Sequence, residues 1–89
     1  MRITVTRTGG FGGLTRRASV DTASRAGAED LVPLAEQALA DGHRAERPTG
    51  VPDGFHYEIE ADGEVAYCAD PRLSEAQRSL IVRVLQEGA

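Results

Sequence analysis

Several residue types that commonly mark a function are scarce or missing from this sequence. The 89 residues include no tryptophan, no lysine and a single cysteine, Cys68. One cysteine cannot form an internal disulfide, so a chain this short must be held together by packing, and the composition favours a reducing compartment. We interpret Cys68 as a small buried strand residue, because no neighbouring arginine or histidine pattern indicates a reactive thiolate.

Residues that could bind a metal or carry out catalysis are also sparse. His43 and His56 lie far apart, with no cysteine pair and no His-x-x-x-His spacing, so we expect no metal site in this chain. The serines show no nucleophile elbow. The carboxylates of Glu58, Glu60 and Glu64 fall on outward strand positions or beside a turn, away from the buried surroundings that acid–base catalysis needs. We therefore expect no enzymatic activity and no cofactor.

Long apolar runs are absent as well. The longest extend over only a few residues, far below the ~20 needed to cross a bilayer. Residues 1–6 alternate and do not form the apolar run of a secretory signal, so we expect no membrane partner and a cytoplasmic location. Ten glycines, four prolines and 40% hydrophobic residues are ordinary for a folded protein. The length predicts one domain, residues 1–89, with a single core.

Charge is unevenly distributed along the chain. The net charge of −4 argues against a nucleic-acid partner, because neutralising phosphates needs a basic surface. Residues 1–20 carry four arginines and no acid, whereas residues 53–70 carry six acidic residues and no arginine or lysine. The simpler interpretation is that the two segments balance each other across a solvated sheet face. The alternative is a dipolar surface that orients a protein partner.

The first part of the chain predicts a β-hairpin with a glycine-rich tip. Residues 2–8 alternate β-branched and polar side chains, and residues 14–20 alternate with Leu14 on the apolar side. Between them lies Gly9-Gly10-Phe11-Gly12-Gly13, a poor match for a phosphate loop because an arginine-rich strand follows it instead of a helix. Phe11 either folds back under the sheet or projects as an apolar anchor for a partner.

A second hairpin is predicted further along the chain. Its strands cover about residues 55–61 and 64–69, and Asp62-Gly63 suits a type I′ turn, which needs positive φ at both central residues. The residues expected to point inward from the first of these strands are Phe55, Tyr57, Ile59 and Ala61. In the second, Val65, Tyr67 and Ala69 share one face.

Two amphipathic helices complete the pattern. An apolar stripe predicts the first, capped by Glu29 or Asp30 and ended by Gly42. A capping box at Ser74 and Gln77 begins the second, which extends to about residue 87. The compact solution is an α+β fold of order β-β-α-β-β-α, a four-stranded antiparallel sheet with both helices packed on one face. Periodicity does not predict the strand order.

Together these residues resemble the emfourin family. The resemblance lies in the strand leading into Gly-Gly-Phe-x-Gly at residues 9–13, in Asp-x-Phe-x-Tyr-x-Ile at residues 53–59 and in the C-terminal amphipathic helix. Emfourin is a small protein inhibitor of thermolysin-family zinc metallopeptidases of the protealysin type. The resemblance implies a non-catalytic, protease-binding protein whose partner supplies the zinc, and it places Gly9, Gly10 and Phe11 in the family's loop motif.

Our hypothesis for the binding mode is steric occlusion of the peptidase cleft by the hairpin tip. Thermolysin-like enzymes favour bulky apolar side chains just after the cleaved bond, so Phe11 or Leu14 would fill the apolar pocket beside the metal. Arginines near the tip would meet acidic residues around the cleft. The expected partner-binding residues are Arg7, Gly9, Gly10, Phe11, Gly12, Gly13, Leu14, Arg16 and Arg17. We expect a monomer when free; the alternative function is a regulatory module that docks another protein through a sheet edge.

Overall fold

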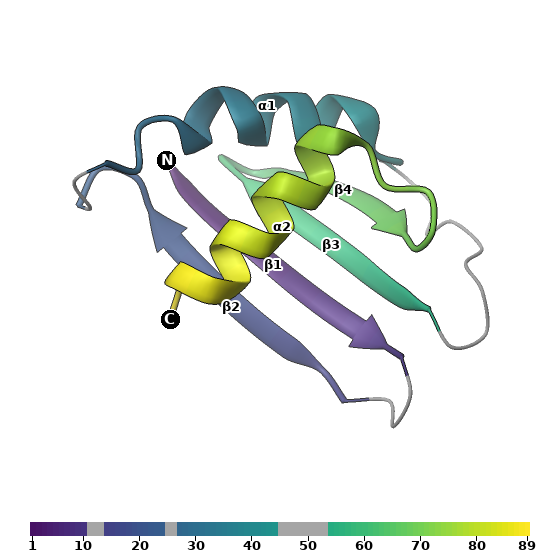
Figure 1. Cartoon of the computed structure of the whole chain (residues 1–89). Helices are drawn as coiled ribbons and strands as arrows, with labels where there is room; N and C mark the ends of the chain where they lie inside the picture. Colours follow the sequence, from purple (N-terminus) through teal and green to yellow (C-terminus); the bar gives the residue numbers. More distant parts are fainter. Residues whose placement is uncertain (11–13, 25–26, 45–53) are drawn as a thin grey trace.

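Four strands form one antiparallel sheet in a computed structural model that describes residues 1–10, 14–24, 27–44 and 54–89. The first hairpin consists of β1 (Arg2–Gly9) and β2 (Arg16–Asp21), and the second of β3 (Phe55–Ala61) and β4 (Glu64–Ala69). The strands lie in the order β2-β1-β3-β4, so each hairpin contributes one central strand (Figure 1). The long-range pairing of β1 with β3 therefore joins the two hairpins.

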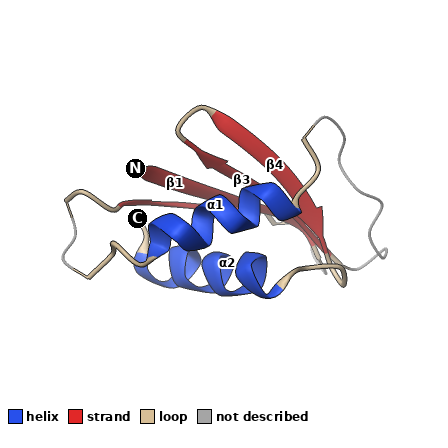
Figure 2. Ribbon diagram, turned by 90° about the horizontal axis from the view of Figure 1, so that it is seen from above, coloured by secondary structure: helices blue, strands red, loops and turns tan. Residues whose placement is uncertain are grey.

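Both helices cover the same face of this sheet (Figure 2). Helix α1 (Leu31–Asp41) packs over β3 and β4, whereas α2 (Glu75–Glu87) packs over β1 and β2, and the two helices contact each other. The predicted α+β fold, with the order β-β-α-β-β-α and both helices on one face, is confirmed. We call the other side of the sheet the open face; it carries the alternate residues of each strand, such as Thr4 and Thr6 of β1 and Glu58 of β3.

The core lies between the sheet and the helices. Its largest apolar side chains are at most 2% exposed and come from both layers: Ile3, Val5, Leu31, Leu39, Ile59, Leu80 and Val84. Burying each such side chain contributes about 1.5–3 kcal/mol, which is the main favourable term for a chain without a disulfide.

Two local sequence signals form as predicted. At the second hairpin, Asp62 and Gly63 both have positive φ (52° and 80°), as a type I′ turn requires. At the start of α2, the Ser74 hydroxyl accepts from the Gln77 N–H at 3.1 Å, and Gln77 Oε1 accepts from the Ser74 N–H at 2.9 Å. Gln77 also donates through Nε2 to the carbonyl of Ala38 at 3.3 Å, so this buried residue ties α2 to α1.

Other details differ from the sequence expectations. Strand β2 begins at Arg16, and Leu14 lies outside it and is 80% exposed, because the β1–β2 ladder ends at the Arg7–Arg16 pair while β1 continues to Gly9 against β3. Gly42 ends α1, but in an extended conformation: its small size is needed because a Cβ there would lie 2.8 Å from the Ala66 Cβ.

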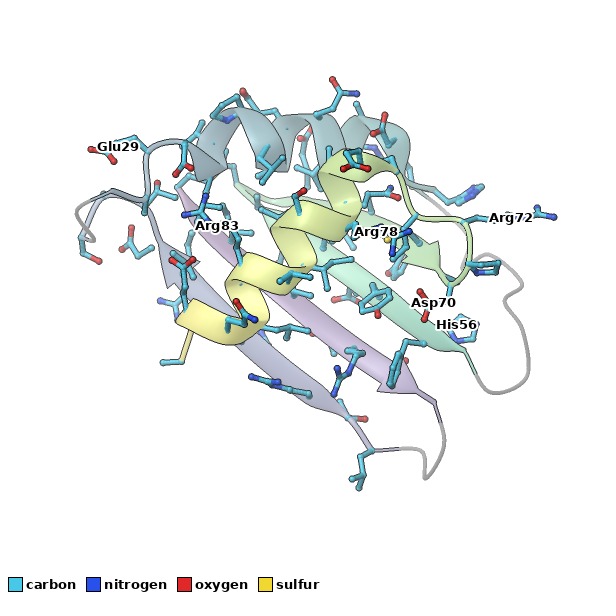
Figure 3. All side chains as sticks on the ribbon, viewed as in Figure 1. Glu29, His56, Asp70, Arg72, Arg78 and Arg83 are labelled. Carbon is cyan, nitrogen blue, oxygen red and sulfur yellow. The ribbon has the colours of Figure 1, made fainter. Side chains whose placement is uncertain are left out.

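Two further points concern the start of α1 and the orientation of β4. The expected cap of α1 does not form a capping hydrogen bond, and the register shows which face of β4 meets the helices. Asp30 occupies the N-cap position without a capping hydrogen bond, and its carboxylate binds Arg83 of α2, the residue labelled in Figure 3, at 2.5 Å. In β4 the residues turned toward the helices are Ala66 and Cys68, because they pair with the inward residues of β3. Tyr67 therefore belongs to the open face.

Candidate functional site

The candidate binding residues that the structure describes gather at one end of the sheet. At this end β1 finishes at Gly9, β2 begins at Arg16, β3 begins at Phe55 and β4 finishes at Ala69 (Figure 1). The pairs Gly9–Phe55 and His56–Ala69 place three of these strand ends side by side. We call this region, with the adjoining residues Gly10, Leu14, Gly54 and Asp70, the loop end. Phe11, Gly12 and Gly13 lie outside the described residues.

The end of β1 and the first loop residue, Gly10, are held against the start of β3. The Gly10 N–H donates to the carbonyl of Gly54 at 3.1 Å, and Gly10 has φ of 75°, which favours glycine. A Cβ at Gly10 would lie 2.2 Å from Cε1 of Phe55, far inside van der Waals contact. Both the backbone conformation and the close approach of Phe55 therefore require glycine here. We call Gly10 the root of the loop, and its contacts hold it in one place.

Phe55 is the platform on which this root lies. Its N–H donates to the carboxylate of Asp70 at 3.2 Å, and its carbonyl accepts from the Asp70 N–H at 3.0 Å. On the ring, the guanidinium carbon of Arg7 lies 4.4 Å from the centroid, a cation–π contact, and Tyr57 packs at 6.2 Å between centroids. The alternation of residues 55–61 predicts that Phe55 points into the core. Phe55 does lie on the inward face and packs against the core, but it is only half-buried, and its ring lies against Gly10.

Leu14 is the apolar residue that the hairpin exposes. Among the described residues, only Leu14 and Val82 are large hydrophobic residues with strongly exposed side chains, at 80% and 48%. Leu14 lies two residues before the start of β2 at the loop end, whereas Val82 lies on α2. The sequence pattern assigned Leu14 to the apolar side of a strand, and no local signal distinguished that position from an exposed one.

The three arginines expected to meet a partner lie on two different faces. Arg7 and Arg16 are directly opposite each other on β1 and β2, on the side of the sheet that carries the helices. Arg16 donates through Nη2 to the carbonyl of Leu85 in the last turn of α2, a favourable position for a cation because the helix dipole is negative there. Arg17 lies on the open face, opposite Thr6.

Several ion pairs in the described part of the chain lie mostly on the helices and their flanks. Among the described residues, ion pairs join Arg83 to Asp30 and Glu87, and Arg44 to Glu64 at 4.0 Å. None of these involves an arginine from residues 1–20.

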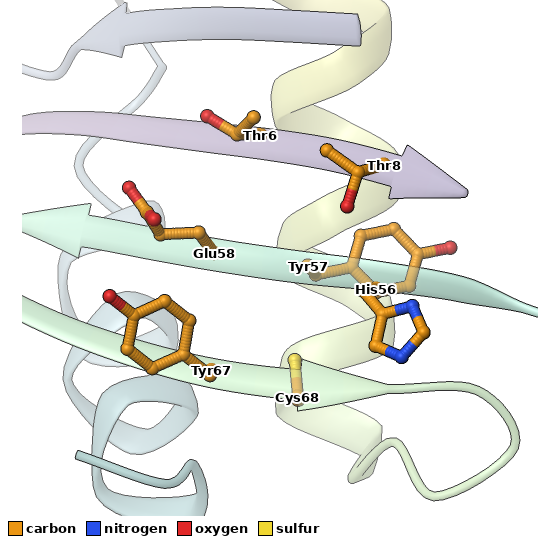
Figure 4. Close-up of a pocket in the computed structure, with 7 residues that line it drawn as sticks. All are labelled: Thr6, Thr8, His56, Tyr57, Glu58, Tyr67 and Cys68. Atoms are coloured by element: carbon orange, nitrogen blue, oxygen red, sulfur yellow. The ribbon is translucent and has the colours of Figure 1, made fainter. Parts of the chain in front are cut away.

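A small pocket opens on the open face near the loop end (Figure 4). Thr6, Thr8, His56 and Tyr67 are among the residues that line it, and its volume is about 20 Å³. A pocket for an organic ligand usually measures about 300–1,000 Å³, so this one has room for little more than a water molecule.

Burial suppresses the chemistry of the residues beneath this pocket. It raises the pKa of the Cys68 thiol from 9.0 to about 11, with a smaller contribution from Asp70. Burial also raises the pKa of Tyr57. A thiol with so high a pKa stays protonated at neutral pH, and Cys68 is 4% exposed, which agrees with its interpretation as a buried strand residue.

The described residues contain neither a metal-binding cluster nor a membrane-spanning helix. No three histidine, cysteine, aspartate or glutamate side chains gather there as a metal site would require. Neither described helix has the length and apolar character of a membrane span.

Comparison with protein families identifies the chain. The Emfourin family model matches residues 5–85, nearly the whole sequence, from the middle of β1 to the last turn of α2. This chain belongs to the emfourin family. Emfourin is the family of protealysin inhibitors, so the resemblance seen in the sequence is confirmed. No curated protein and no solved structure matches the chain.

Proposed function

We propose that this protein inhibits thermolysin-like zinc metallopeptidases of the protealysin type, as a non-catalytic partner that blocks the active-site cleft. The observation that carries the proposal is the emfourin match over residues 5–85. In the proposed complex the tip of the first hairpin enters the cleft, and the peptidase supplies the zinc. An apolar side chain, Phe11 or Leu14, fills the pocket that the enzyme normally offers to a bulky apolar substrate residue.

The geometry of the loop end supports this binding mode. Leu14 exposes 80% of its side chain, and an exposed leucine next to a fixed strand end can be buried by a partner. The hydrogen bond from Gly10 to Gly54 and the Phe55 platform hold the root of the loop before binding. A root that is already ordered lowers the entropy that the loop loses on association.

The alternative, docking through a sheet edge, has less support. Both edge strands have a central residue whose outward main-chain groups are already used. On β2, Ser19 donates to and accepts from Ala89 at 3.2 and 3.1 Å. On β4, Tyr67 makes the same two bonds with His43 at 2.7 and 2.9 Å. A strand added at either edge would have to displace one of these pairs.

The proposal is tested by titrating the protein into protealysin-type and other thermolysin-like peptidases while following hydrolysis of a quenched peptide. We expect stoichiometric inhibition with the inhibitor remaining intact. Leu14→Ala should raise the inhibition constant about 10-fold or more, because burying a leucine contributes about 1.5–3 kcal/mol. Val82→Ala, the matched exposed site on α2, should leave inhibition unchanged. Full peptidase activity at a stoichiometric excess of inhibitor across several such enzymes would refute the proposal, and equal effects of the two variants would remove Leu14 from the interface.

A further inference from the structure

Two arginines of like charge face each other beside the hairpin tip. Arg7 and Arg16 are direct cross-strand partners, and theirs is the last pair of the β1–β2 ladder before the chain turns into the loop. Like charges directly opposite on antiparallel strands are destabilising. Acidic residues outnumber arginines in this protein, whose net charge is −4, so the sequence has enough carboxylates to pair with each arginine.

Each arginine is instead held by a neutral group. Arg7 lies over the ring of Phe55, and Arg16 donates to the main-chain carbonyl of Leu85. None of the ion pairs among the described residues uses either side chain. Within the same part of the chain, the buried Nε of Arg7 has no hydrogen-bond partner.

These contacts fix the positions of two guanidinium groups without neutralising their charge. A guanidinium has five N–H donors in a planar fork, and a stacking contact or a single hydrogen bond leaves several of them for another acceptor. The two side chains start from strand positions that pair directly. One carboxylate accepts several charge-assisted hydrogen bonds, so a carboxylate bound between them can take donors from both guanidinium groups and reduce the repulsion between the arginines.

We propose that Arg7 and Arg16 form a receptor for a carboxylate side chain on the rim of the peptidase cleft, next to the site that the hairpin tip occupies. This inference rests on the proposed function. It separates Arg7 and Arg16, which make a short-range contact in the complex, from Arg17, which faces the opposite side of the sheet and contributes only to the long-range field. Short-range charge pairs act mainly on dissociation, whereas long-range charge acts on association.

The test compares three variants that remove the same charge, Arg7→Gln, Arg16→Gln and Arg17→Gln, against a peptidase that the wild-type protein inhibits. Association and dissociation rates are measured separately at low and at high salt, and a thermal melt confirms that each variant is folded. We expect Arg7→Gln and Arg16→Gln each to weaken inhibition about tenfold or more, mainly through faster dissociation that persists at high salt. Arg17→Gln should change only the association rate, and only at low salt.

Two further variants show whether both arginines serve one carboxylate. The double variant of Arg7 and Arg16 should lose less affinity than the product of the two single losses. If both arginines bind one carboxylate, the first substitution already weakens the hold on that carboxylate, so the second substitution has less binding energy to remove. Arg16→Lys should retain more affinity than Arg16→Gln, since it keeps the charge while losing the planar fork.

The outcomes separate this inference from the proposed function. If the wild-type protein inhibits and Arg7→Gln and Arg16→Gln do so equally well, the carboxylate receptor is refuted and the proposed function stands. Equal, salt-sensitive losses in all three variants would also overturn the receptor, because they would show a general field. A wild-type protein that inhibits none of these peptidases would refute the proposed function, and the receptor with it.

Discussion

Replacing Gly10 with alanine should destabilise the protein more than the same change at Gly63. The two glycines have nearly the same backbone conformation, with φ of 75° and 80°. Forcing an L-residue into this left-handed region costs about 1–2 kcal/mol at either site. The surroundings differ: a Cβ at Gly63 meets nothing within 4 Å, whereas one at Gly10 would lie 2.2 Å from Cε1 and 2.8 Å from Cδ1 and Cζ of Phe55.

The ring of Phe55 would have to move away from Arg7 to make room for that methyl group. Overpacking of this kind costs about 1–3 kcal/mol, and the lost cation–π contact costs about 0.5–1 kcal/mol. Gly10→Ala should therefore exceed Gly63→Ala by about 2 kcal/mol in the free energy of unfolding. For a domain of this size, that difference corresponds to about 8–16 °C in Tm.

The assay is urea unfolding followed by circular dichroism, with the wild-type protein, both alanine variants and the Phe55→Ala background. Removing the ring should reduce the cost of Gly10→Ala to that of Gly63→Ala, because only the backbone term remains. The reasoning is refuted if Gly10→Ala costs no more than Gly63→Ala, or if its cost is the same with and without the Phe55 ring. In inhibition assays, Gly10→Ala should also weaken binding more than Gly63→Ala.

Two further predictions concern stability. Gln77→Ala should lower the free energy of unfolding in urea by about 1–3 kcal/mol, because it removes half of the capping box and leaves the Ala38 carbonyl without its buried donor. The control, Gln37→Ala at an exposed position of α1, should change stability by no more than about 0.5 kcal/mol. Equal costs of the two variants would contradict this account. Because burial raises the pKa of Cys68 in the folded protein, the contribution of the protonated thiol to the free energy of unfolding is complete below about pH 9. That contribution is lost as the pH rises toward 11. Between pH 8 and 10.5 the wild-type protein should therefore lose about 2 kcal/mol more stability than Cys68→Ala, and parallel pH profiles would contradict the burial effect.

Most of the secondary structure could be predicted because its signals are local. The Asp62-Gly63 turn needs only two residues with positive φ, and the Ser74–Gln77 capping box lies within one helical turn. Residues 65–69 are all apolar, however, so alternation showed which side chains share a face of β4 without showing which face the helices cover. That choice depends on the register with β3.

The candidate site was less predictable, because its geometry depends on pairing between distant segments. The need for glycine at residue 10 comes from the ring of Phe55, and the facing arginines come from a register that ends at Arg7 and Arg16. The strand pattern placed Leu14 on an apolar side without showing that β2 begins only two residues later, at Arg16. Phe11, the residue that first drew attention to the loop, lies outside the described residues and stays a prediction.

The most direct test of cleft occlusion is a competition between this protein and a small hydroxamate that chelates the zinc of a peptidase it inhibits. Binding of the protein is measured at increasing hydroxamate concentrations. The account predicts that the two ligands exclude each other, so the apparent Kd of the protein rises in proportion to the hydroxamate concentration. A ternary complex in which the protein binds the hydroxamate-loaded peptidase with unchanged affinity would show that it acts away from the cleft, and would contradict the central claim.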